Sequence, residues 1–150
     1  MVIFITLITI LHAAFFFYDE YFLNKKRTLS QIEINSAIID GVLFLSIVAL
    51  TIFTSFNSQL SNIYIALSIL SCISIIKNEF LYESIPKIER VVHSILYITH
   101  PLILFAFYSS WKMDFFSTNS TYWMLQLGYF ALGFKAIAYH VIYWNFIHNK

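Results

Sequence analysis

Five apolar segments of bilayer-spanning length follow one another along this chain, and they constrain its fold more than any other feature. A helix needs about 20 consecutive, mainly apolar residues to cross the hydrocarbon core of a membrane. Hydrophobic residues make up 59% of the 150 residues and charged residues only 11%, whereas a soluble domain carries about 25% charged residues. We therefore predict an all-α fold, an integral membrane bundle of five transmembrane helices. The predicted spans run from about Val2 to Leu23, Ser30 to Phe56, Ser61 to Phe80, Pro86 to Ser110 and Thr121 to Phe146.

The chain shows no sign of a second domain. No repeat, low-complexity tract or long linker interrupts it, so residues 1–150 are expected to form a single transmembrane helical domain. Its first residues lack the positively charged region of a signal peptide, and we interpret them as the start of a retained span. Ser30 and Glu33 have the spacing of a capping box, which predicts a helix start. The lone Cys72 excludes an internal disulfide bond.

The positively charged residues predict an orientation in the membrane, because Lys and Arg are enriched in short cytoplasmic loops. The side of the bundle opposite the N-terminus would carry most of them, namely Lys25, Lys26, Arg27, Lys77, Lys87, Arg90 and Lys150. The side of the N-terminus would carry only Lys112 near a span end. We therefore expect an inner or plasma membrane location, with the N-terminus outside and the C-terminus in the cytoplasm.

The fourth span carries a stripe of titratable residues in an otherwise apolar sequence. At about 100° per residue, Glu89, His93 and His100 fall within an arc of about 40° on one helix face. Titratable residues are costly in hydrocarbon, so they normally face the interior of a bundle or water. We expect this stripe to face partners on the first, second and fifth spans.

Other spans contribute residues of the same kind at similar depths. Imidazole and carboxylate groups together are ligands for zinc, iron or manganese. Two layers are expected, an outer layer with Glu20, Glu33, Glu89 and His93 and an inner layer with His12, Asp40, His100 and His140. The predicted metal ligands are His12, Glu20, Asp40, Glu89, His93, His100 and His140. Asp19, Glu33, Glu79 and Lys77 are expected to support them as hydrogen-bonding or ion-pairing partners.

A purely structural interpretation of these residues stays open. The acidic residues near the predicted span ends could be solvated or paired with neighbouring Lys and Arg. Histidines inside the bundle could form hydrogen bonds with Ser and Tyr across helices. The sparse histidines also differ from the dense histidine boxes of membrane fatty-acid desaturases and hydroxylases, and we assign no family.

The leading functional hypothesis is a small integral-membrane metalloprotein with an intramembrane site of histidine and carboxylate side chains. It would be a metal-dependent hydrolase or oxidoreductase acting on a lipid or other lipophilic molecule; no single catalytic residue is assigned. One alternative is a haem-binding electron-transfer subunit, with His12 and His100 as axial ligands. Another is a non-catalytic proton or ion transporter or an assembly subunit. Membrane lipid is the expected partner, and the net charge of +1 gives no indication of nucleic-acid binding.

Overall fold

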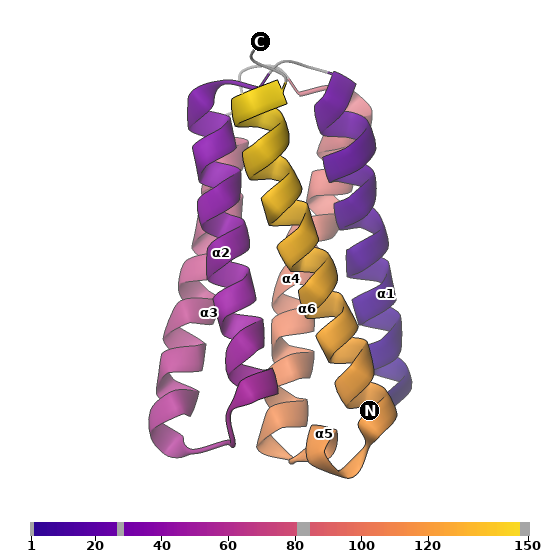
Figure 1. Cartoon of the computed structure of the whole chain (residues 1–150), viewed down its shortest axis with the longest axis vertical. Helices are drawn as coiled ribbons and strands as arrows, with labels where there is room; N and C mark the ends of the chain where they lie inside the picture. The colour runs from indigo at the N-terminus through magenta and orange to yellow at the C-terminus, as the bar shows by residue number, and fades with distance from the viewer. Residues whose placement is uncertain (1, 27–28, 81–84, 148–150) are drawn as a thin grey trace.

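The computed structural model of the chain describes residues 2–26, 29–80 and 85–147, and every secondary-structure element in these residues is helical. Five helical segments among them are long and apolar enough to cross a membrane, as the sequence predicted. They lie lengthwise beside one another (Figure 1). The elements are α1 (Val2–Tyr18) with its continuing turns η1 (Asp19–Leu23) and η2 (Asn24–Lys26), α2 (Gln31–Phe53), α3 (Ser58–Glu79), α4 (Lys87–Lys112), the short α5 (Phe115–Thr118), and α6 (Ser120–Ile142) with its continuing turn η3 (Tyr143–Ile147).

The N-terminal ends of α2 and α4 lie close to where the sequence predicted helix starts. The capping box before α2 is confirmed: the Ser30 hydroxyl accepts a bond from the Glu33 backbone N–H at 3.3 Å, and the Glu33 carboxylate accepts one from the Ser30 N–H at 2.7 Å. Pro86 lies one position before α4, at its N-cap. The helix then continues through Pro101. The short α5 was not predicted.

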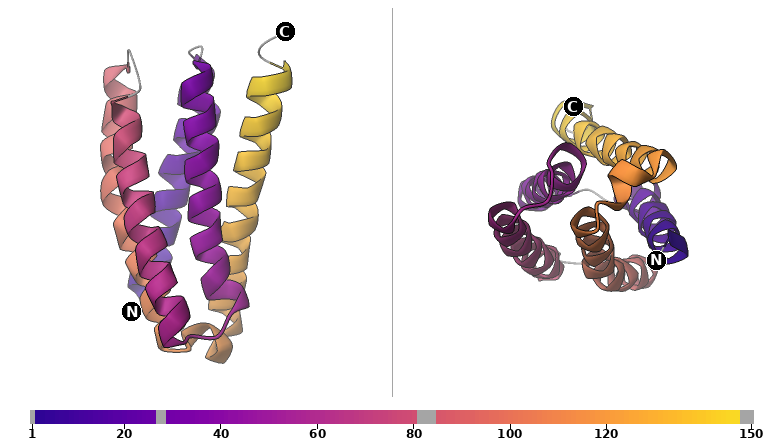
Figure 2. Two further views of the ribbon diagram at one scale, coloured as in Figure 1. Left: turned by 90° about the vertical axis from the view of Figure 1, so that its left-hand side faces the viewer. Right: turned by 90° about the horizontal axis from the view of Figure 1, so that it is seen from below.

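Viewed along its long axis, the bundle is a ring of helices in the order α1, α4, α3, α2, α6 (Figure 2). Helix α1 packs against α4, and α2 packs between α3 and α6. Helices α1 and α6 close the ring with few direct packing contacts. Side chains that bridge α1 and α6 therefore contribute to the closure of the ring.

The bundle exposes many large apolar side chains, and it buries polar side chains as well as apolar ones. Its exposed side chains include Ile3, Leu7, Phe22, Ile32, Phe105 and Phe134. Its buried polar side chains include His12, Glu20, Glu89, His93, His100, Gln126 and His140. In the most apolar stretch of α4, half of the residues are buried. The corresponding share is 17–28% in the other four segments, so α4 is the most buried of the five.

Two glycines let α2 and α6 approach closely. A Cβ atom on Gly41 would lie 2.7 Å from Cγ1 of Ile137, and one on Gly133 would lie 2.8 Å from Cδ2 of Leu45. Each helix thus offers a glycine to a larger side chain of the other. Small residues at helix interfaces allow close backbone approach and are enriched where helices pack in membranes.

The positively charged side chains sort between the two ends of the bundle as the sequence predicted. The ends of α1 and α3 and the start of α4 lie together at one end, and they carry Lys25, Lys26, Lys77, Lys87 and Arg90 (Figure 1). Lys112 ends α4 at the other end. Lys135 is exposed on the outer side of α6, where a long side chain can extend its charged head along the helix surface.

Candidate metal site and the adjoining cavity

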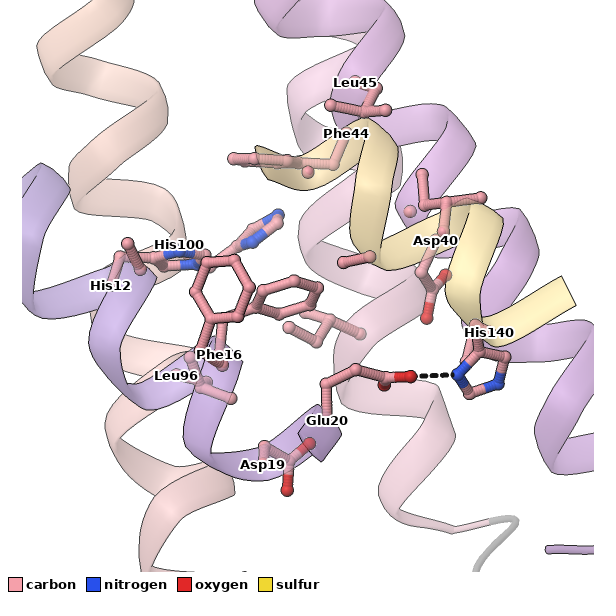
Figure 3. A pocket seen from close by; sticks show the side chains of 18 of the residues that line it. His12, Phe16, Asp19, Glu20, Asp40, Phe44, Leu45, Leu96, His100 and His140 are labelled. Atoms are coloured by element: carbon pink, nitrogen blue, oxygen red, sulfur yellow. Dashed lines mark hydrogen bonds and ion pairs between the residues drawn. The ribbon is translucent and has the colours of Figure 1, made fainter. Parts of the chain in front are cut away.

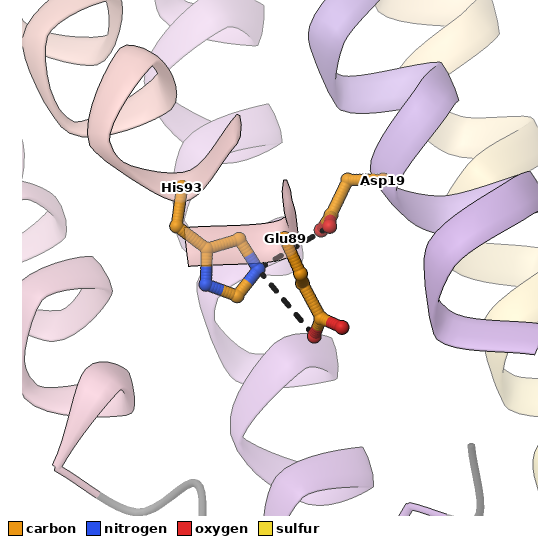
Figure 4. Close-up of side chains that lie close together, drawn as sticks. All are labelled: Asp19, Glu89 and His93. Atoms are coloured by element: carbon orange, nitrogen blue, oxygen red, sulfur yellow. Dashed lines mark ion pairs between the residues drawn. The ribbon is translucent and has the colours of Figure 1, made fainter. Parts of the chain in front are cut away.

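Asp19, Glu89 and His93 form a compact group between the end of α1 and the first turns of α4 (Figure 4). Nε2 of His93 lies 3.2 Å from Oδ1 of Asp19 and 3.9 Å from Oε1 of Glu89. The side chains of Glu89 and His93 are 1% and 7% exposed, and that of Asp19 is 15% exposed. In the described part of the chain, this is the one group of three His, Cys, Asp or Glu residues whose potential ligand atoms all lie within 4.8 Å of one another.

These separations are close to those around a bound metal ion. An ion with tetrahedral bonds of about 2.05 Å holds its ligand atoms about 3.3 Å apart. The two distances from His93 are within about 0.6 Å of this spacing, and a separation of 4.8 Å would have to shorten by about 1.5 Å to reach it. Two carboxylates also balance the charge of a divalent cation, which favours binding in a desolvated site.

The prediction that the stripe on the fourth span faces the bundle is confirmed, because Glu89, His93 and His100 are all buried. The contact between His93 and Asp19 provides the partner that was expected on the first span. His100 contacts Ser71 of α3, whereas the sequence predicted that the stripe would face partners on the first, second and fifth spans.

The sequence assigned Glu20 to the metal layer and Asp19 to a supporting role, and the structure arranges them the other way round. The chain forms a π-helical turn from Asp19 to Leu23, with wider i→i+5 bonds than an α-helix. Asp19 contacts His93 of α4, while Glu20 forms a 2.6 Å pair with Nδ1 of His140 on α6. The sequence grouped Glu20 with Glu89 and His93 by depth along the helix, and depth does not give the direction in which a side chain points.

Three predicted inner ligands have hydrogen-bonding partners outside the metal group. Nδ1 of His12 lies 2.7 Å from the Tyr129 hydroxyl, and Nε2 of His100 lies 2.8 Å from the Ser71 hydroxyl. Asp40 accepts a short hydrogen bond from Ser74. For His12 and His100, these contacts are the bonds to Tyr and Ser expected from the structural interpretation.

The remaining predicted residues lie away from the group as far as the structure describes them. The carboxylate of Glu33 caps α2. Lys77 is exposed in the last turn of α3, where a cation interacts favourably with the helix dipole. The side chain of Glu79 lies outside the described residues.

A cavity of about 150 Å³ adjoins the metal group inside the ring of helices (Figure 3). Asp19 and His93 contribute to its wall, and so do the paired Glu20 and His140. Apolar side chains such as Phe44 form most of the rest of the wall. An open coordination position on an ion bound at Asp19 and His93 would therefore be close to a largely apolar space.

No similar protein provides an independent indication of function. Comparison of the chain with protein-family models, with curated proteins and with solved structures found no match. The functional assignment rests on the chemistry of the buried residues around the cavity.

Proposed function

We propose that this chain is an integral membrane protein that binds one divalent metal ion through Asp19, Glu89 and His93 and uses it on a lipophilic substrate. The membrane location is supported by the five apolar helices and by the large apolar side chains exposed on their outer faces. Contiguous apolar surface of this kind is unfavourable in water and favourable in a bilayer.

The observation that carries the metal proposal is the approach of three potential ligand atoms to within 4.8 Å of one another in a buried position. Buried carboxylates are costly unless they are paired or coordinate a metal, and Glu89 is 1% exposed. The mixed set of one nitrogen and two oxygen ligands suits zinc, iron or manganese.

Three protein ligands are characteristic of catalytic metal sites, which keep a further position for water or substrate. A bound ion here would polarise a substrate oxygen or activate water. The neighbouring apolar cavity would exclude bulk water and would favour a lipophilic molecule over a polar one.

A metal ion fits the buried residues better than a haem group. The His100 nitrogen that would ligate iron, Nε2, is hydrogen-bonded to Ser71. The ring of Phe44 packs against both candidate axial ligands, with centroids 5.6 Å from His12 and 4.8 Å from His100. This aromatic side chain occupies space beside the two histidines that a macrocycle would need.

Metal analysis of the purified full-length chain tests the proposal. We expect about one equivalent of zinc, iron or manganese in the wild type and loss of that metal in the Asp19→Asn and His93→Gln variants. His100→Gln is the matched control, because His100 is also buried on α4 but contacts Ser71 instead of the metal group.

A second measurement separates metal loss from misfolding. Added metal should raise the unfolding temperature of the metal-stripped wild type, because a ligand that binds only the folded state stabilises it. The same addition should leave the unfolding temperature of a folded Asp19→Asn protein unchanged. Wild-type protein that neither retains metal nor is stabilised by added zinc, iron(II) or manganese would refute the proposal.

A further inference from the structure

The wall of the cavity has an acidic region and an aromatic region. Asp19, Glu20 and Asp40 belong to the acidic region, and Phe16 and Phe44 lie near His12 and His100 in the aromatic region (Figure 3). A cavity of about 150 Å³ in a protein interior can hold a benzene-sized molecule. The size and the lining together point to a small, mainly apolar ligand.

His12 adds one specific polar feature to the aromatic region. Its ring lies nearly parallel to that of Phe44, at 15° and 5.6 Å between centroids, and its Nδ1 atom is paired with the Tyr129 hydroxyl. The other ring nitrogen, Nε2, is buried and makes no hydrogen bond within the described residues, although the residue is only 4% exposed. Buried polar atoms almost always have a partner, and because His12 lines the cavity we take a group bound there as the missing partner of this atom.

The expected ligand group follows from the chemistry of imidazole. With Nδ1 engaged by Tyr129, Nε2 either donates or accepts a hydrogen bond, depending on which tautomer is present. A hydroxyl group can act as donor and as acceptor, so it pairs with Nε2 in both cases. The rings of His100 and Tyr129 also lie beside His12, at 5.8 and 6.1 Å between centroids, so a hydroxyl bound there would have polar neighbours as well as the ring of Phe44.

We propose that this cavity binds a small lipophilic alcohol, with its hydroxyl on Nε2 of His12 and its hydrocarbon part against Phe16 and Phe44. The inference rests on the proposed function in taking the cavity as the substrate site, and it names the substrate class as hydroxyl-bearing. The binding contacts themselves do not require the metal ion. His12 acts here as a binding residue, about 10 Å along the helix axis from Asp19.

Binding can be measured directly on the full-length chain in lipid nanodiscs. The protein is labelled with ¹⁵N-histidine, and cyclohexanol is compared with methylcyclohexane, a probe of similar size that lacks the hydroxyl. We expect cyclohexanol to shift the Nε2 resonance of His12 saturably, and methylcyclohexane to produce no comparable shift.

Two variants test the location of the ligand. His12→Phe keeps an aromatic ring but removes Nε2, and we expect at least tenfold weaker cyclohexanol binding. Ala37→Leu adds bulk to the cavity wall without changing His12, and it should also weaken binding. Equal responses to both probes, shifts of all five histidines together, or no saturable shift at all would overturn the inference.

The same preparation is analysed for metal, so that the two proposals can fail separately. Metal at one equivalent without saturable cyclohexanol binding would overturn the substrate inference alone. Saturable binding to a protein that cannot take up metal would retain the alcohol site and overturn the metal site.

Discussion

Because α2 and α6 approach closely, alanine substitution at three glycines should change the free energy of unfolding by different amounts. At Gly41, a Cβ atom would lie 2.7 Å from Cγ1 and 2.8 Å from Cδ1 of Ile137. Favourable carbon contacts lie at about 3.5–4.0 Å, so these atoms would have to separate by about one ångström. Ile137 is β-branched and rotates little about χ1, which leaves the helices themselves to move apart.

The expected magnitudes follow from two opposing terms. Replacing Gly by Ala in a helix interior gains about 1 kcal/mol of helical propensity. Overpacking an interface costs about 1–3 kcal/mol. The stiff contact at Gly41 should therefore place Gly41→Ala toward the upper end of the net range, with a destabilisation of up to about 2 kcal/mol.

The other two glycines provide graded controls on the same protein. At Gly133 the nearest atom is Cδ2 of Leu45 at 2.8 Å, the far end of a flexible side chain, so Gly133→Ala should change stability by less than about 1 kcal/mol. At Gly128 a Cβ atom would meet nothing within 4 Å. Gly128→Ala should therefore be neutral or stabilising by up to about 1 kcal/mol.

The free energy of unfolding, measured by denaturant titration in mixed micelles, ranks the three variants. Ile137→Ala should rescue part of the defect of Gly41→Ala in a double-mutant cycle, because it removes the clashing atoms. Equal stabilities for Gly41→Ala and Gly128→Ala would refute the close approach of α2 and α6.

Two further predictions address the topology and the closure of the ring. A reporter fused after Lys150 should be cytoplasmic and a tag inserted within residues 117–121 should be external; detection of both in one compartment would contradict the five-span topology. Glu20→Gln and His140→Gln should each destabilise the bundle by about 1–3 kcal/mol, because each replaces one partner of a buried hydrogen bond between Glu20 and His140. The double variant should lose much less than the sum of the two, and additive losses would show that the pair is not coupled.

The sequence predicted which residues share a face on α4, but it did not predict which residues at the end of α1 contact them. On α4, the angular spacing of Glu89, His93 and His100 correctly predicted one buried stripe. At the end of α1 the sequence grouped Glu20 with Glu89 and His93 by depth, whereas in the structure Asp19 contacts His93 and Glu20 pairs with His140.

The neighbours of each histidine depended on the order of the helices around the ring. Axial depth follows from counting residues, since each adds about 1.5 Å, so residues of similar depth could be grouped in advance. Which of these residues contact one another depends on which helices are neighbours in the ring. The position of α1 between α4 and α6 brings Glu20 to His140 and His12 to Tyr129, while α3 beside α4 brings Ser71 to His100.

The sequence by itself determined the helical class, the five long apolar segments, the capped start of α2 and the burial of the polar stripe on α4. These properties follow from local hydrogen bonding and from the cost of placing polar groups in an apolar environment, which act on each segment separately. Only the tertiary structure decided that Asp19, Glu89 and His93 converge and that an aromatic cavity lies beside them. Whether these three side chains meet depends on how the helices pack side by side, and their outer surfaces are nearly uniformly apolar. A few residues such as Gly41 and Gly133 determine that packing.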